Sequence, residues 1–98
     1  MAHIGFEWDD DKSQINNKKH GVTFDEAQTI FSDENALLIP DPEHSTDEDR
    51  FILLGLSAKF RILVVCHCYR SSDEIIRIIS ARKAGKVEEK QYWERWKR

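Results

Sequence analysis

The sequence has few cysteines and no long apolar segment, and each shortage excludes a class of protein. Cys66 and Cys68 are the only cysteines in 98 residues. Their spacing is too short for an ordinary disulfide and too sparse for a metal site, so we expect reduced core residues. No apolar run approaches the roughly 20 residues of a membrane helix. Residues 1–11 lack the apolar core of a signal peptide. We therefore expect a cytoplasmic protein with no membrane contact.

Familiar catalytic and cofactor signatures are absent as well. The chain has no phosphate-binding Walker loop, no GxGxxG, no HExxH and no paired CxxC motif. It also has no local signature of Ser/His/Asp catalysis. We therefore predict neither a cofactor nor a bound metal. No repeat, linker or low-complexity segment divides the chain, so residues 1–98 are expected to form a single domain.

Charge is distributed unevenly along the chain. The net charge is −3. Residues 1–58 contain four Lys/Arg and thirteen Asp/Glu, whereas residues 59–98 contain eleven Lys/Arg and five Asp/Glu. The first segment is therefore acidic and the second basic. A basic half can attract polyanions even when the whole protein is acidic. Ordinary surface charge explains the same counts, and both interpretations stay open here.

Periodicity and turn residues predict three helices and four strands, in the order ααββββα. Asp9 can cap a helix that ends near His20, and Gly21 suits the left-handed position after it. Thr23 and Glu26 form a capping-box pattern for a second helix. Apolar runs predict strands at 36–39, 51–57, 61–69 and 74–84, and a terminal helix at 86–98. Short connections favour an antiparallel meander. The predicted class is α+β: two N-terminal helices, a four-stranded antiparallel sheet and a C-terminal helix.

An arginine stands among four isoleucines in the last predicted strand. Burying a guanidinium is costly unless it is paired or faces a wet cleft, so Arg77 needs a carboxylate or an anionic ligand. Alternation places Arg77 on the face of Ile75 and Ile79, and Arg82 on the face of Ser80. Arg77, Arg82 and Lys83 form a cationic group suited to a phosphodiester whose transition state gains negative charge. In the alternative interpretation, Arg77 is a structural strut that pairs with a carboxylate.

Other polar and aromatic groups are weaker candidates, each with a plain structural alternative. One face of the first helix can donate to phosphate or simply be solvated: it carries Lys12, Asn16, Lys19 and His20. The segment 44–50 offers proton transfer and charge stabilisation through His44, Glu48 and Arg50, or is a flexible acidic loop. His67 and Tyr69 are placed on the strand beside Arg77. The terminal aromatics can stack RNA bases or pack into the core: Tyr92, Trp93 and Trp96.

Several of these residues together form a pattern that resembles the BrnT family. The opening signature is Phe6-Glu7-Trp8-Asp9 with Lys12, Asn16, Lys19-His20-Gly21-Val22, Phe24 and Ala27. The later signature is His44-Ser45, Glu48 and Arg50, then Arg77-Ile78-Ile79-Ser80-Ala81-Arg82-Lys83-Ala84, then Glu88 or Glu89 and Tyr92. The motifs cover nearly the whole chain in order, which makes the resemblance more specific than any single motif.

The resemblance implies the toxin of a type II toxin–antitoxin pair with a RelE-like fold. It implies a ribonuclease that inhibits translation and is neutralised by a BrnA-like antitoxin. Our leading hypothesis is a metal-independent endoribonuclease, in which the 2′-hydroxyl of RNA attacks the adjacent phosphate. DNA would be contacted only through that antitoxin. The catalytic candidates are His44, Glu48, Arg50, Arg77 and Arg82, and the substrate-binding candidates are Lys19, His20 and Lys83. Two alternatives stay open: a catalytically weak module for antitoxin binding and operon autoregulation, and a regulator that binds nucleic acid alone.

Overall fold

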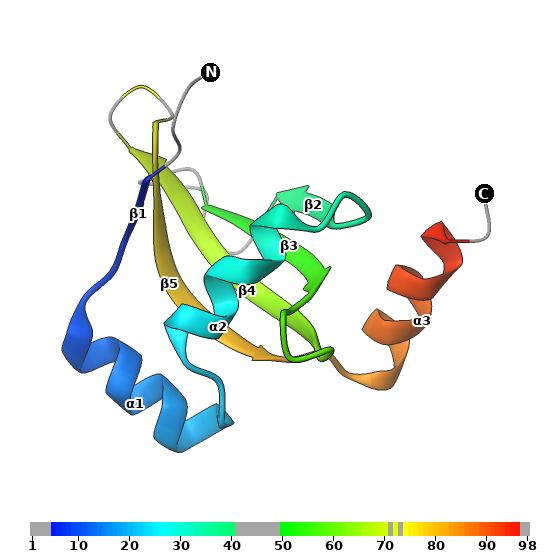
Figure 1. Cartoon of the computed structure of the whole chain (residues 1–98), viewed down its shortest axis with the longest axis horizontal. Coiled ribbons are helices and arrows are strands. Elements are labelled where there is room, and N and C mark those ends of the chain that lie inside the picture. The colour runs from blue at the N-terminus through cyan, green and yellow to red at the C-terminus, as the bar shows by residue number, and fades with distance from the viewer. Residues whose placement is uncertain (1–4, 41–49, 71, 73, 97–98) are drawn as a thin grey trace.

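Five strands form one mixed sheet, with helices on both of its faces (Figure 1). The computed structural model describes residues 5–40, 50–70, 72 and 74–96. The strands lie in the order β1-β5-β4-β3-β2. The elements along the chain are β1 (Gly5–Glu7), α1 (Asp10–His20), α2 (Phe24–Thr29), the short 3₁₀ helix η1 (Ile30–Ser32), β2 (Leu37–Pro40), β3 (Arg50–Leu56), β4 (Ile62–Arg70), β5 (Ile75–Lys83) and α3 (Lys86–Arg95).

The predicted α+β class is confirmed, but the sheet and the second helix differ from the prediction. A fifth strand, β1, pairs in parallel with the start of β5, so that Glu7 lies opposite Arg77. β1 could not be predicted, because three residues are too few to show the alternation of a strand and its partner β5 is distant in the chain. The other pairings are antiparallel, as predicted. The second predicted helix is divided into α2 and η1.

The ends of α1 and the start of α2 follow from the predicted capping residues. The Asp9 side chain accepts a hydrogen bond from the Lys12 backbone N–H at 3.1 Å. Gly21 takes the left-handed conformation, with φ of 69°, and donates its N–H to the Asn17 carbonyl at 2.8 Å. Thr23 caps α2 by accepting from the Glu26 N–H at 3.1 Å. Local sequence chemistry therefore determines these boundaries.

The Glu26 carboxylate does not complete the predicted capping box. It is buried and turns toward the connection between β3 and β4 instead. Ser57 Oγ donates to it at 2.7 Å, and Arg61 Nε donates at 2.9 Å. The Arg61 guanidinium also donates to the Gly21 carbonyl at 3.0 Å. One buried carboxylate thus ties α2, the β3–β4 connection and the end of α1 together.

The two faces of the sheet are covered differently. The helical face packs against α1, α2 and η1, and its core is apolar: Val22, Phe24, Ala27, Ile30, Leu53, Leu63, Val65, Ile76, Ile78 and Ala81. We call the other side the open face, because α3 covers only one end of it. Its smaller core surrounds Tyr92 and contains Leu54, Ile62 and Val64. Figure 1 shows α2 in front of the sheet, α1 below β1, and α3 displaced toward the β2–β3 side.

Asn16 closes the edge of β5 beyond the short strand β1. Its side-chain amide donates to the Ala81 carbonyl at 2.8 Å and accepts from the Ala81 N–H at 3.1 Å. The same amide donates to the Val22 carbonyl at 2.9 Å. A single side chain on α1 thereby supplies the pair of hydrogen bonds that a neighbouring strand would make. Asn16 thus attaches α1 to β5, about one helical turn before His20.

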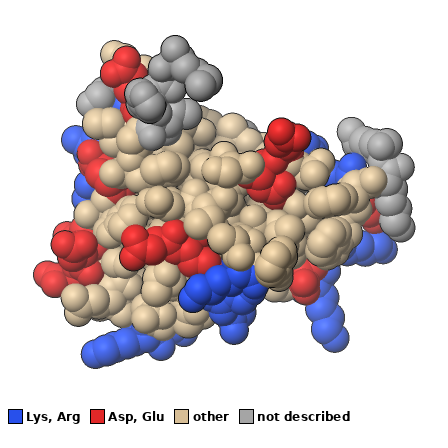
Figure 2. Space-filling view, viewed as in Figure 1, with Lys and Arg blue, Asp and Glu red and all other residues tan. Residues whose placement is uncertain are grey.

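Charged side chains are distributed unevenly over the surface. Figure 2 shows acidic atoms scattered over the helical face, whereas basic side chains gather along the lower rim, below α1, the β3–β4 connection and α3. Within the part of the chain that the structure describes, no helix has the length and apolar character that a membrane span requires.

Candidate active site

A cavity of about 220 Å³ lies on the open face, beside the end that α3 covers. Three of the predicted site residues line it, and they come from separate elements. His20 ends α1, Arg50 begins β3 and Arg82 lies near the end of β5. The remaining lining residues are Ile52, Val64, Cys66, Ile79, Ser80 and Ala81. The fold therefore brings together two guanidinium groups and an imidazole that are far apart in the sequence.

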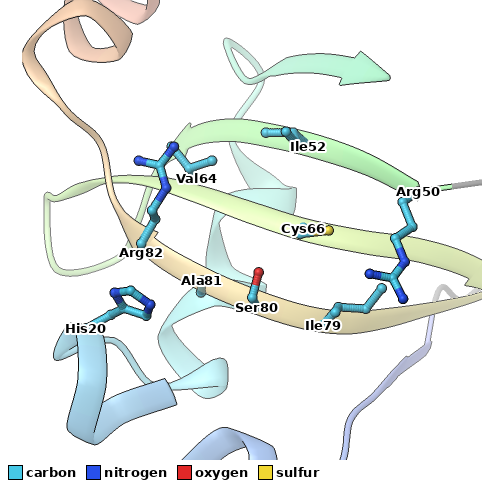
Figure 3. Close-up of a pocket in the computed structure, with 9 residues that line it drawn as sticks. All are labelled: His20, Arg50, Ile52, Val64, Cys66, Ile79, Ser80, Ala81 and Arg82. Carbon is cyan, nitrogen blue, oxygen red and sulfur yellow. The ribbon is translucent and has the colours of Figure 1, made fainter. Parts of the chain in front are cut away.

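The strand register determines where the two arginines lie. Arg50 is opposite Cys68 of β4, and Arg82 is opposite Val64. Residues that pair across neighbouring strands form a row of the sheet. The rows of Arg50 and Arg82 are four residues apart on β4, or roughly 13 Å at 3.3 Å per residue. Figure 3 shows Arg50 beside Ile79 at one end of the cavity and Arg82 with His20 at the other. A phosphate in the cavity would therefore be approached by cations from both ends.

A β-bulge places Arg82 on the open face, which corrects the predicted alternation. Cys66 pairs with Ser80 and His67 with Ile78, so that Ile79 is an extra residue in β5. Ile78 faces the helical core, whereas Ser80 lines the cavity. Arg82 therefore lies on the same face as Arg77, not on the opposite one. The bulge inverts the side-chain direction for the second half of the strand.

Arg82 is held by a carboxylate from α3. Its Nη1 donates to Glu88 Oε1 at 2.8 Å, and its Nη2 donates to Glu88 Oε2 at 2.7 Å. This pairing raises the pKa of Arg82 and lowers the pKa of Glu88, so both groups are charged near neutral pH. The Arg82 side chain is 46% exposed. It therefore meets solvent in the cavity while its orientation is fixed.

Arg77 pairs with Glu7 of β1 and does not line the cavity. Its Nη1 donates to Glu7 Oε2 at 2.6 Å, with both side chains about one-third exposed. Arg70 Nε also approaches Glu7, at 3.7 Å. Arg77 is opposite Cys68, in the same row as Arg50. Arg77 therefore has the carboxylate partner that its burial required. Its partner is Glu7, whereas Arg82 pairs with Glu88, so the two arginines belong to separate ion pairs.

Other predicted site residues lie elsewhere. Lys19 is exposed on α1 and does not line the cavity. Lys83 is opposite Leu63, a residue of the helical-face core, so it projects to the side away from the cavity. His44 and Glu48 lie outside the residues that the structure describes. The geometry adds Ser80, Cys66 and Glu88, which the sequence interpretation did not assign to the site.

The prediction that His67 lies beside Arg77 is wrong. The His67 side chain points into the core on the helical face of the sheet. It is fully buried, with ring centroids 4.8 Å from Phe31, 6.2 Å from Phe51 and 5.2 Å from Tyr69. Its Nδ1 lies 3.3 Å from the Val65 carbonyl oxygen, and its Nε2 lies 3.3 Å from the Tyr69 hydroxyl. Burial lowers the pKa of His67, so the ring is neutral. This histidine packs the core.

The terminal aromatics divide between two roles. Tyr92 is fully buried and donates its hydroxyl to Asp33 Oδ2 at 2.6 Å, which fastens α3 to the loop before β2. Burial and this carboxylate raise the pKa of Tyr92 to about 12. Trp93 and Trp96 are 44% and 51% exposed, with ring centroids 5.7 Å apart. Core packing therefore accounts for Tyr92 but leaves two large apolar side chains in solvent.

The cavity offers positive charge and an imidazole ring. Among the described residues, no group of three His, Cys, Asp or Glu side chains is arranged to hold a metal ion. Two guanidinium groups and an imidazole at the ends of a cavity with a mixed polar and apolar lining suit the binding of a phosphodiester and the transfer of protons near it.

Comparisons with known proteins agree with this geometry. A family model described as "Ribonuclease toxin, BrnT, of type II toxin-antitoxin system" matches residues 8–88. The crystal structure of the Brucella abortus ribonuclease toxin BrnT superposes with a TM-score of 0.66 and 25% sequence identity, over 85% of this chain and 99% of the Brucella chain. Comparison with curated proteins gave no match. Because the family model covers most of the sequence, the chain belongs to the BrnT family of ribonuclease toxins from type II toxin–antitoxin systems.

Proposed function

We propose that this chain is a metal-independent endoribonuclease that inhibits translation and is neutralised by a BrnA-like antitoxin. The observation that carries the proposal is the cavity on the open face, which Arg50 lines at one end and Arg82 and His20 at the other. The ribonuclease family supplies the reaction class, and the cavity supplies groups that fit it. In this proposal the arginines provide the positive charge that a metal ion provides in other nucleases.

The proposed reaction is an in-line transfer within the RNA strand. The 2′-hydroxyl loses its proton to a base and attacks the adjacent phosphorus, forming the O2′–P bond. The P–O5′ bond breaks, and the leaving 5′ oxygen takes a proton from an acid. The products are a 2′,3′-cyclic phosphate and a 5′-hydroxyl. Arg82 and Arg50 would stabilise the charge on the phosphate oxygens, an effect worth about 100- to 1000-fold in rate for one well-placed donor.

We propose that His20, His44 and Glu48 are the candidates for proton transfer. His20 lines the cavity and lies about one helical turn after Asn16, whose amide attaches α1 to β5. His44 and Glu48 precede Arg50 in the sequence, and their proposed roles rest on the family resemblance. Comparing His20→Ala, His44→Ala and Glu48→Gln would assign the acid and the base, because loss of either one removes one limb of the pH–rate profile.

Lys19, Lys83 and Arg77 are proposed to contact RNA outside the cavity. Arg77 lies on the same face as the cavity, in the row of Arg50. The RNA continues on both sides of the cleaved bond, and its other phosphates lie outside the cavity. Cations that bind these phosphates increase the affinity for RNA and not the rate of cleavage. Their removal should weaken binding and reduce its salt dependence.

The antitoxin proposal rests on the family and on the exposed tryptophans. Type II systems pair a toxin with an antitoxin protein, and Trp93 and Trp96 present apolar rings that a partner can bury. Aromatic side chains are enriched among the residues that dominate binding energy. We expect Trp93→Ala and Trp96→Ala to weaken binding of the BrnA-like protein and to leave RNA cleavage intact.

The alternative is a module with weak catalysis that mainly binds the antitoxin and supports operon autoregulation. One observation favours it: Arg77 and Arg82 already hold carboxylates in this structure. An antitoxin carboxylate could take the place of Glu7 or Glu88, and strong binding to RNA would then be unnecessary. Growth arrest on expression that is lost in Arg82→Ala supports the ribonuclease. Absence of growth arrest for the wild type supports the binding module.

The decisive experiment is expression of the wild type, Arg82→Ala and Arg50→Ala, with mapping of RNA ends. We expect growth arrest, reduced incorporation of amino acids and 2′,3′-cyclic phosphate ends for the wild type, and none of these for Arg82→Ala. Lys90→Ala, an exposed substitution on α3, is the control and should behave as wild type. Purified protein should cleave RNA equally with and without EDTA. Cleavage by folded Arg82→Ala at the wild-type rate would contradict the proposal.

A further inference from the structure

Glu88 does not line the cavity, yet it determines how Arg82 is presented there. Both of its carboxylate oxygens accept from Arg82, at 2.8 Å and 2.7 Å. Arg82 also donates from Nη1 to the Lys83 carbonyl at 3.3 Å. Three of the five guanidinium N–H groups of Arg82 are thus engaged by the residues that the structure describes.

The covalent geometry of arginine identifies the two N–H groups that are left. Nη1 lies on the same side as Cδ, so Nε and Nη2 share the other edge of the planar group. Glu88 occupies the Nη1–Nη2 edge, and the Lys83 carbonyl accepts from Nη1. The Nε–H and the second Nη2–H therefore form one intact fork, and no acceptor within the described residues lies on it. Two parallel N–H donors match the spacing of two phosphate oxygens.

Glu88 is itself fixed in place. Its Oε1 accepts from the Gly85 backbone N–H at 2.8 Å, which caps the start of α3. The helix is fastened further along by the Tyr92 hydroxyl on Asp33, and by Arg95 Nε, which donates to the Asn35 carbonyl at 3.0 Å. The cap orders the first turn of α3, and the bonds of Tyr92 and Arg95 attach its second half to the loop before β2, so the movement of the Glu88 carboxylate is restricted.

We propose that Glu88 is a positioning residue that directs the Nε–Nη2 fork of Arg82 at the phosphodiester of the RNA substrate. This inference rests on the proposed function, in which Arg82 binds the reacting phosphate. A fork held by a capped helix loses less freedom on binding than a mobile arginine. An error of about 1 Å in such a contact lowers the rate by roughly 100-fold. Glu88 acts through Arg82 and does not touch the substrate.

The test is a double-mutant cycle on cleavage of a short RNA oligonucleotide by the purified full chain. The variants are Glu88→Gln, Arg82→Lys and the double variant. Lysine keeps a cation but has no planar fork, so residual activity stays measurable. Glu88→Asp is a second variant that keeps the charge and shortens the reach. Glu89→Gln, at an exposed neighbouring position, is the matched control. Thermal unfolding confirms that each variant is folded.

We expect Glu88→Gln and Glu88→Asp to lower kcat by about 10- to 100-fold, with KM changed less than about threefold. Glu89→Gln should match the wild type. In the Arg82→Lys background, Glu88→Gln should have little further effect, since the fork is already lost.

Three outcomes would overturn the inference. An equal loss from Glu88→Gln in both backgrounds would mean that it acts only through the stability of α3. An unchanged or raised kcat for Glu88→Gln would mean that the carboxylate competes with phosphate for Arg82. Wild-type kinetics for Arg82→Lys and Arg82→Ala would remove Arg82 from the reaction, and the proposed function would then fail together with the inference.

Discussion

The two faces of one sheet show how 98 residues can combine a stable core with a charged site. On the helical face, the residues that contact α1, α2 and η1 are apolar and largely inaccessible, and Val22, Phe24 and Leu63 are fully buried. On the open face, α3 covers only the region around Tyr92, and the remaining surface holds the arginines. The main apolar core and the arginines of the cavity therefore lie on opposite faces of the same sheet.

This separation explains how an apolar strand tolerates two arginines. A guanidinium on the helical face would be enclosed without water, at a cost of several kcal/mol. On the open face, Arg77 and Arg82 keep access to solvent and each gains a carboxylate, Glu7 or Glu88. The parallel strand β1 and the helix α3 thus supply the partners. Neither partner is adjacent to its arginine in the sequence.

Phe24→Ala should give the largest effect, because it empties part of the helical-face core. Phe24 is fully buried, and truncating such a ring costs about 3–5 kcal/mol of unfolding free energy. Phe60→Ala is the matched control, since that ring is 84% exposed and its loss should change stability by less than about 0.5 kcal/mol. Urea denaturation measures both. Equal losses would contradict the assignment of this face as the main source of stability.

Asn16→Ala should cost about 2–3 kcal/mol, because it leaves three buried backbone groups without their partner. Asn17→Ala, at the exposed neighbouring position, should change stability by less than about 0.5 kcal/mol. Loss of Asn16 also releases the end of α1, so the contribution of His20 to cleavage should fall. If Asn16→Ala were as stable as Asn17→Ala, the edge of β5 would not depend on this amide.

Local chemistry predicted the elements, whereas long-range pairing determined the site. Asp9, Gly21 and Thr23 act within a few residues of the ends that they define, so their roles could be predicted from the sequence. β1 could not, because three residues have no pattern and their partner is distant. The bulge at Ile79 left no signal among consecutive isoleucines, yet it decides the face of Arg82. Arg50, Arg82 and His20 were candidates in three separate groups, by residue type and by resemblance, and only the fold brings them to one cavity.

Stability should fall in mild acid because of the buried histidine on the helical face. Burial lowers the folded-state pKa of His67 below its ordinary value of 6.5, so the unfolded chain binds a proton more readily. The neutral ring therefore contributes stability above pH 6.5. This contribution is lost as the pH falls from 6.5 toward the lowered pKa, at up to about 1.4 kcal/mol per pH unit.

His67→Phe is the variant that isolates this effect, since it keeps a ring among the aromatic neighbours and removes the titration. Unfolding free energies measured between pH 7 and pH 5 should slope for the wild type and be nearly flat for the variant. The lowered carboxyl pKa values of Glu26, Asp33 and Glu88 act at more acidic pH, outside this window. Identical slopes would mean that His67 is not the group that titrates.

Arg77 should give the smallest effects, and they decide what its pair with Glu7 is for. A salt bridge between side chains that are one-third exposed contributes about 0–1 kcal/mol to stability. If Arg77 contacts a phosphate outside the cavity, Arg77→Ala should weaken RNA binding about fivefold and reduce the salt slope by about 0.7. Glu7→Gln should leave binding unchanged or tighten it, because the guanidinium loses a competing carboxylate. Equal losses of stability in both variants, with RNA binding unaffected, would instead make the pair a strut between β1 and β5.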